Sequence, residues 1–304
     1  MAKRTFYAAK INIHGNIFSQ NLQELIHIYI PNTILESVPI KVNTWNWTFT
    51  DVKEVISNDR KIIVGNVTKS KYQNQTVRIN TVTKRVKSEH ELAYRAFFVY
   101  DPIGEILAHE STSSISANEF IYMFKNLLSR NPLIGEVKIV PVPEPFMIRK
   151  EILSIEKLTQ VNFHLIHPNP GKQEFNLYQR MIKENRLKEL DIKMTNKDGL
   201  DLSSKETITN VHENKPTFTN AIEDGIALVE AGYGQVEVRG YDEVKIQGKK
   251  KELTRKQRRA FSSKRSVRTL KSSERDNSRL LPRIVDFILD VINKHQKEGG
   301  NIEG

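Results

Sequence analysis

Short segments rich in Val, Ile, Thr and aromatic residues, separated by polar turns, fill the chain as far as Glu110 and constrain its fold more than any other feature. They lie at residues 6–13, 44–52, 61–67, 75–86, 94–102 and 105–110. Segments of this length and composition are typical of antiparallel β-strands joined by turns. We expect one helix among them, over residues 22–30, which shows helical spacing of apolar residues and is closed by Pro31.

The pattern changes at Ser116, after which helices and strands follow one another. Ser116 and Glu119 form an S-x-x-E capping box, which predicts a helix that ends before Pro132. Further helices are expected over residues 173–190 and 218–231, and strands over 135–142, 160–166, 191–194 and 235–246. An antiparallel half followed by mixed units predicts an α+β fold. We expect an N-terminal α+β domain over residues 1–147, a C-terminal α+β domain over 148–296 and a disordered tail over 297–304.

A long amphipathic helix is predicted near the end of the chain, over residues 280–293. Its apolar residues fall on one side of the helix, opposite Asp286, Asp290 and Arg283. They are Leu280, Leu281, Ile284, Val285, Phe287, Ile288, Val291 and Ile292. Such a stripe is expected to be buried, either within its own domain or against a second copy. Pro282 fits this helix only in the first turn.

The segment from Lys249 to Lys271 contains eleven cations and one acid, Glu252, so that it holds nearly all of the chain's formal net charge of +11. The cations are Lys249, Lys250, Lys251, Arg255, Lys256, Arg258, Arg259, Lys264, Arg265, Arg268 and Lys271. Thr254 and Gln257 form a possible capping box, which predicts a short helix with four cations on one side. The residues from Ser262 onward are expected to be flexible until something binds them.

We interpret this segment as a phosphate-binding surface, because a charge run that served only solubility would not leave the remaining chain nearly neutral. Arginine and lysine bind backbone phosphates without reading sequence. A solvated, disordered charge run between two folded parts remains an alternative, and so does electrostatic association with a membrane. Membrane association is disfavoured because the segment contains few large apolar residues.

No catalytic constellation, cofactor motif or metal-binding motif is recognised in the sequence. The absence of cysteine excludes disulfides and thiolate zinc sites. Asp101, Glu105 and Glu110 cluster near a predicted turn and are the candidates for a metal-dependent nuclease, although such a motif would have lysine where Arg239 stands. Trp45, Trp47 and Phe49 share one face of a strand, and we expect them to form core rather than to stack bases.

The layout of residues 90–250 resembles the RexA family of phage-exclusion proteins of lambdoid prophages. The resemblance rests on the aromatic strand that ends in "DPIG" (Asp101 to Gly104), the helix "NEFIYMFKNLL", the strand "GEVKIVPV" and the strand "NFHLIH". It implies a dimer that binds DNA without sequence preference, acts against superinfecting phage and works upstream of a membrane protein encoded nearby. It also implies a distant relation to the ring-forming RdgC family. The dense basic segment departs from the RexA pattern.

Together these features predict a cytoplasmic, sequence-independent DNA-binding protein of phage defence, most simply a homodimer that cradles or encircles duplex DNA and requires no cofactor. The absence of a signal peptide, of a long apolar run and of cysteine favours the cytoplasm. The alternative is a nuclease or RNA-targeting toxin of a phage-defence system, in which the basic segment only holds the substrate.

Overall fold

Strand pairing organises the chain into two units, each with its own sheet and core. The computed structural model describes residues 2–15, 24–144, 147–169, 177–201, 218–245, 253–261, 265–272 and 277–299. The first unit comprises residues 1–139 and 267–289, and the second comprises 140–266 and 290–304. The α+β fold predicted from the sequence is confirmed. Because the first unit takes in a segment from near the end of the chain, no single cut point separates the two units.

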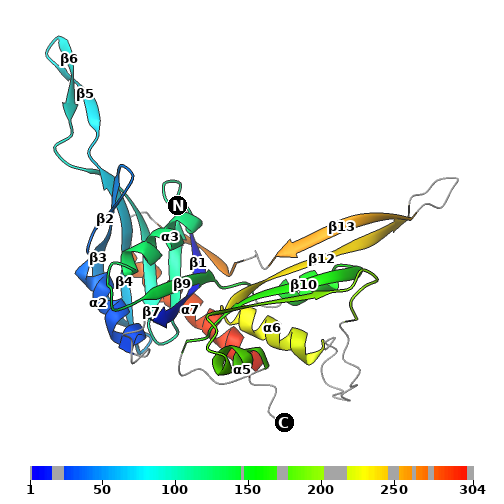
Figure 1. Cartoon of the computed structure of the whole chain (residues 1–304). Coiled ribbons are helices and arrows are strands. Elements are labelled where there is room, and N and C mark those ends of the chain that lie inside the picture. The colour runs from blue at the N-terminus through cyan, green and yellow to red at the C-terminus, as the bar shows by residue number, and fades with distance from the viewer. Residues whose placement is uncertain are drawn as a thin grey trace. The chain divides into compact units, whose positions relative to one another are not determined.

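The first unit is built on an eight-stranded sheet in the order β14-β1-β8-β7-β4-β3-β2, with β9 paired to β1 (Figure 1). The strands are β1 (Ala2–Gly15), β2 (Ile40–Val42), β3 (Trp45–Ser57), β4 (Arg60–Lys71), β7 (Leu92–Asp101), β8 (Ile106–Ser111), β9 (Glu136–Pro141) and β14 (Val267–Ser272). Each pair of neighbouring strands in that order is antiparallel. The antiparallel sheet expected in the first half of the chain is therefore present.

Two helical segments contribute to the core of this unit. Helix α3 (Ala117–Leu128) begins as the capping box predicts, because the Ser116 side chain accepts a hydrogen bond from the Glu119 N–H at 3.2 Å. The earlier segment is a π-helical turn, η1 (Leu25–Tyr29), followed by α2 (Ile30–Glu36). The expectation that Pro31 ends this helix is wrong. Pro31 lies in the first turn of α2, which continues directly from η1, so that the helical backbone runs on past the proline.

Aromatic side chains from β3, β7 and α3 fill the core of the first unit. Phe49, Phe98 and Phe124 make edge-to-face contacts with ring centroids 5.0–5.7 Å apart. Trp47 and Phe49 are buried, and the half-buried Trp45 packs against the same cluster. The core role expected for these three residues is confirmed.

A two-stranded ribbon, β5 (Asn74–Ile79) and β6 (Val82–Lys87), extends from the ends of β4 and β7 (Figure 1). The sequence predicted one strand over residues 75–86, whereas the structure divides it at Asn80 and Thr81. Asn80 has a φ of 55°, a left-handed conformation that Asn tolerates and that tight hairpin turns require. The Asn80–Thr81 pair was a turn signal that the strand prediction overlooked.

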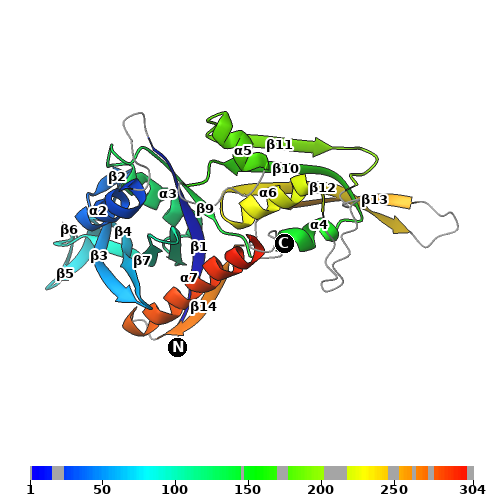
Figure 2. The same ribbon diagram turned by 90° about the horizontal axis from the view of Figure 1, so that it is seen from below.

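The second unit is a four-stranded antiparallel sheet in the order β11-β10-β12-β13. The strands are β10 (Lys157–Ile166), β11 (Glu189–Thr195), β12 (Gly234–Lys245) and β13 (Leu253–Phe261), and the helices are α4 (Met147–Leu153), α5 (Leu177–Glu184) and α6 (Asn220–Glu230). Ile222 and Ile226 of α6 join Phe163 and Val236 of the sheet in one buried cluster. Helices α5 and α6 cover the same face of the sheet (Figure 2).

Helix α7 (Asn277–Gly299) is the long amphipathic helix that the sequence predicts. Six of the eight residues in its apolar stripe are buried, and Leu281 and Ile292 are half-buried. The expected position of Pro282 is wrong: because the helix begins at Asn277, Pro282 lies beyond its first turn. Of the expected disordered tail, residues 297–299 belong to α7 and residues 300–304 lie outside the described part of the chain.

Candidate nucleic-acid interface

The basic segment does not form one element, because most of its described residues lie on two strands in different units. Residues 253–261 form β13 of the second unit, and residues 267–272 form β14 of the first. The helix predicted from Thr254 is therefore wrong. Lys249, Lys250, Lys251 and Lys264 lie outside the described residues.

Strand β13 exists because it pairs with β12 over nine residues, from Glu237 opposite Phe261 to Lys245 opposite Leu253. The cations of β13 come as two adjacent pairs, at positions 255–256 and 258–259, and successive residues of a strand point to opposite faces of the sheet. The four cations that were expected on one side of a helix are therefore divided between the two faces of the sheet. Arg255 and Arg259 belong to one face of the strand, and Lys256 and Arg258 to the other.

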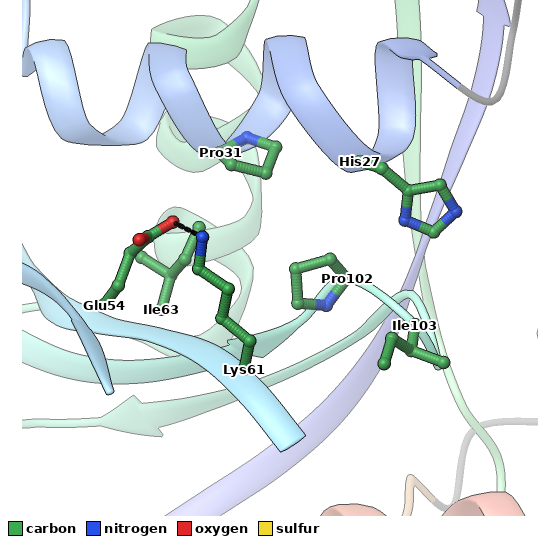
Figure 3. Close-up of a pocket in the computed structure, with 7 residues that line it drawn as sticks. All are labelled: His27, Pro31, Glu54, Lys61, Ile63, Pro102 and Ile103. Carbon is green, nitrogen blue, oxygen red and sulfur yellow. Dashed lines mark ion pairs between the residues drawn. The ribbon is translucent and has the colours of Figure 1, made fainter. Parts of the chain in front are cut away.

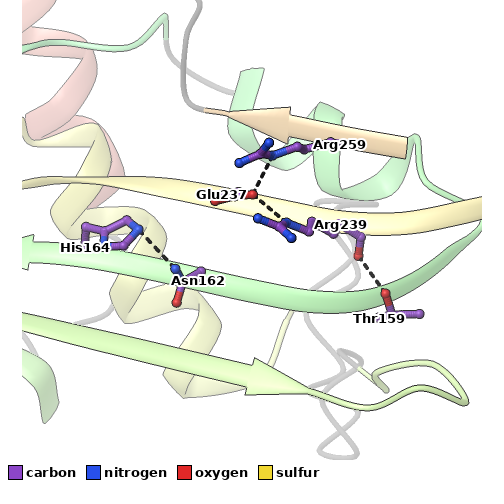
Figure 4. Close-up of polar contacts among 6 residues, drawn as sticks. All are labelled: Thr159, Asn162, His164, Glu237, Arg239 and Arg259. Atoms are coloured by element: carbon purple, nitrogen blue, oxygen red, sulfur yellow. Dashed lines mark hydrogen bonds and ion pairs between the residues drawn. The ribbon is translucent and has the colours of Figure 1, made fainter. Parts of the chain in front are cut away.

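One face of the second unit's sheet carries an arginine–glutamate–arginine cluster (Figure 4). Glu237 Oε1 on β12 lies 2.6 Å from Arg259 Nε on β13 and 2.6 Å from Arg239 Nε on its own strand. The hydrogen bond from Arg259, and then that from Arg239, lowers the pKa of the Glu237 carboxyl. One buried carboxylate thus holds two half-exposed guanidinium groups side by side, and the cluster retains a net positive charge.

Polar and charged side chains continue this face beyond the cluster. Asn162 on β10 lies opposite Glu237 and also opposite the exposed Lys193 on β11. The Asn162 amide nitrogen lies 3.0 Å from His164 Nε2, and His164 Nδ1 lies 2.6 Å from Asp191 Oδ1. The helices cover the opposite face, where Val161, Phe163 and Val238 are buried. The sheet therefore presents an open face of hydrogen-bonding groups and arginines.

On the helix-covered side, β13 makes a second ion pair. Arg258 Nη1 donates to Asp242 Oδ2 at 2.7 Å, and Arg258 Nη2 lies 3.4 Å from Ser154 Oγ. A hydrogen bond from the Glu156 N–H, together with the charge of Arg258, lowers the pKa of Asp242. Arg258 is thus partly used for structure, whereas its neighbour Lys256 is exposed.

The remaining predicted cations have separate surroundings. Arg265 forms an isolated strand bridge with Pro143 and is half-buried. Arg268 on β14 stacks over the Phe287 ring of α7 at 5.4 Å, which gives it a role within the first unit. Lys271, on the same strand, is exposed and pairs in register with Lys3.

Sequence reasoning missed Glu237, Asn162 and Lys193 as members of this face. The signal was present, because polar and apolar residues alternate in "QVNFHLI" and in "QVEVRG". What the sequence does not contain is the pairing of these strands, which places Arg259 beside Glu237.

The three candidate nuclease carboxylates do not form a shared site. Each is paired with its own cation: Asp101 with Arg60 at 2.8 Å, Glu105 with Lys10 at 2.9 Å and Glu110 with Arg4 at 2.7 Å. Five residues of strand, about 16 Å, separate Glu110 from Glu105. Across the described ranges, no three His, Asp or Glu side chains are grouped as metal ligands.

One small pocket, of about 230 Å³, lies in the first unit (Figure 3). It is lined by His27, Pro31, Glu54, Lys61, Ile63, Pro102 and Ile103. Lys61 Nζ pairs with Glu54 Oε1 at 2.9 Å, so the lining's one carboxylate is already neutralised. The remaining polar group of the lining is the His27 imidazole.

Within the described residues, no helix has both the length and the apolar character to cross a membrane. A comparison with curated proteins finds no match for the chain. The model of one protein family, described as a domain of unknown function, matches residues 3–275, which is most of the chain. The chain therefore belongs to the family DUF4747.

Proposed function

We propose that the chain binds duplex DNA without sequence preference through the open face of the second unit's sheet and the basic strand at its edge. The supporting observation is the cluster of Arg239, Glu237 and Arg259 on a face that no described helix covers. The half-exposed guanidinium groups suit phosphate oxygens, which they can contact with two parallel hydrogen bonds.

The hairpin of β12 and β13 enlarges this surface. Pairing between β10 and β12 ends at Tyr241, whereas pairing between β12 and β13 continues to Lys245. The last part of the hairpin is therefore a two-stranded ribbon that carries the exposed Lys256. Phosphate contacts from such a ribbon would position DNA without reading its bases.

The resemblance to phage-exclusion proteins supplies the setting of the proposal: a cytoplasmic homodimer that acts in phage defence together with a membrane protein. Two copies related by a twofold axis would double the phosphate contacts on one duplex and raise its affinity. A dimer closed around DNA would slide off linear duplex but remain on circular duplex, which a competition between the two forms would detect.

The salt dependence of duplex binding tests the proposal. A variant with Arg239→Gln, Arg259→Gln and Lys193→Gln should flatten the slope of log K against log salt by about 2.7 per protomer, at about 0.9 for each lost phosphate contact. The matched control replaces three exposed cations of the first unit, as Lys53→Gln, Arg130→Gln and Arg283→Gln, and should keep the parent slope. Equal slopes for both variants would refute this surface.

An assay for cleavage separates binding from catalysis. The parent protein is incubated with plasmid and with total RNA, in the presence and absence of magnesium or manganese. Intact nucleic acid is expected. Cleavage that requires magnesium or manganese would support the nuclease alternative instead.

A further inference from the structure

The β5–β6 ribbon of the first unit is a charged surface that lies outside the basic segment. In the described structure its two strands pair only with each other. Eleven of their twelve residues are exposed, and Val77 is half-buried. An isolated hairpin of this kind is at best marginally stable in water, so such a ribbon gains stability by binding something.

The charge of the ribbon is all of one sign. From Tyr72 to Ser88 the sequence contains Arg78, Lys84, Arg85 and Lys87 and no acidic residue. At the base of the ribbon, Lys87 Nζ lies 4.3 Å from the centroid of the Tyr72 ring, which holds this cation in place. A surface with four cations and no anions repels a second copy of itself and attracts a polyanion.

The pairing register divides the ribbon into two different faces. Arg78 lies opposite Thr83, Thr76 opposite Arg85, and Asn74 opposite Lys87, which gives a cationic face. The alternate residues form the other face, which is largely apolar and carries one cation, Lys84; its apolar members are Val77, Ile79, Val82 and Val86. At the tip, Ile79 and Val82 lie opposite each other and are 50% and 53% exposed.

We propose that this ribbon is a second DNA contact, in which Arg78, Arg85 and Lys87 bind phosphates and the tip pair of Ile79 and Val82 inserts between base steps of the minor groove. Apolar side chains used as wedges unstack a base step and bend the duplex, and they need no particular sequence. Apolar residues at the tip of a cationic hairpin provide both parts of that interaction. This inference rests on the proposed function, because it requires that the chain bind duplex DNA.

The wedge is tested by measuring DNA bending with full-length protein. A duplex of about 30 base pairs carries donor and acceptor dyes at its ends, and the parent protein should shorten the distance between them. Replacing the tip as Ile79→Thr and Val82→Thr keeps β-branched residues but removes the apolar wedge, and it should abolish most of the bend. The matched control, Val77→Thr with Val86→Thr, changes the same face away from the tip and should bend DNA as the parent does.

The cationic face is tested separately by salt dependence. Arg78→Gln, Arg85→Gln and Lys87→Gln together should flatten the slope by about 2.7. An unchanged slope, or full bending by the tip variant, would overturn the inference. A lower molar mass of the cationic-face variant in light scattering, at unchanged DNA affinity, would show that the ribbon contacts a second copy and would likewise overturn it. If the parent protein binds no duplex at all, the proposed function itself fails, which is a different result.

Discussion

Gly225 on α6 lies directly over the ring of Phe163 on β10, so closely that a Cβ atom at Gly225 would stand 2.6 Å from Phe163 Cζ. Real Cβ atoms do not approach that closely, so a larger residue would push the helix away from the sheet. The glycine thus sets how closely α6 can pack behind the open polar face.

Gly225→Ala should destabilise the second unit, by about 1–3 kcal/mol for the overpacked contact. The higher helix propensity of Ala offsets up to about 1 kcal/mol of that cost. Chemical denaturation followed by circular dichroism measures the difference. Ala227→Ser, at an exposed position of the same helix, should change the free energy of unfolding by less than about 0.5 kcal/mol.

Glu237→Gln should strengthen DNA binding, because it removes the negative charge that holds Arg239 and Arg259. We expect a three- to tenfold lower dissociation constant with a salt slope like that of the parent, because the same two arginines contact phosphates in both proteins. The matched control is Asp242→Asn, which frees Arg258 on the side of the sheet that faces the helices. A larger gain from Asp242→Asn than from Glu237→Gln would show that DNA binds on the helix-covered side of the sheet and not on the open face.

Acid should weaken the contribution of Glu237 to stability. The folded protein holds the pKa of this carboxyl below its usual value of 4.5, so it binds protons more weakly in the folded state than in the unfolded state. The stabilisation is therefore fully present above pH 4.5 and is lost as the pH falls through the lower, folded-state pKa. Unfolding free energies of parent and Glu237→Gln protein, measured from pH 7 down to pH 3, should converge in acid. A difference that stays constant over this range would contradict the lowered pKa.

Replacing only one partner of the Lys10–Glu105 ion pair should lower the free energy of unfolding strongly. Both side chains are buried, and Lys10 Nζ also donates to the Gly104 carbonyl at 2.9 Å. Glu105→Gln should destabilise the first unit by about 3–5 kcal/mol, because it leaves a buried ammonium without its counter-ion. Adding Lys10→Met should restore much of that loss.

The exposed Lys61–Glu54 pair serves as the comparison for this prediction. Its separation is the same 2.9 Å, but its side chains are 67% and 37% exposed. Glu54→Gln should cost no more than about 1 kcal/mol. Equal costs for Glu54→Gln and Glu105→Gln in thermal unfolding would contradict the argument from burial.

The parts of the fold that were predictable from the sequence are those with local signals. The capping box at Ser116 and Glu119 involves four consecutive residues, and the apolar stripe of α7 repeats along a single helix. The basic strand β13 is different, because its paired cations and scattered apolar residues satisfy a short helix equally well. Its conformation is decided by β12, and that pairing brings Arg259 to Glu237 across 22 positions of sequence. Much of the candidate site is therefore a product of tertiary pairing, which composition and spacing do not encode.

The pairing of β1 with β14 has a consequence for synthesis on the ribosome. Residues 2–7 of β1 pair with residues 267–272, which are made only after the 155 residues from Thr112 to Ser266 have followed β8. At a rate of about 5–20 residues per second, this segment of β1 waits several seconds or longer for its second neighbour. During that time its backbone N–H and C=O groups form an open strand edge, to which a nascent chain on a neighbouring ribosome could pair. Residues 140–266 of the second unit are translated within this interval, so their rate of synthesis sets how long the first sheet stays incomplete.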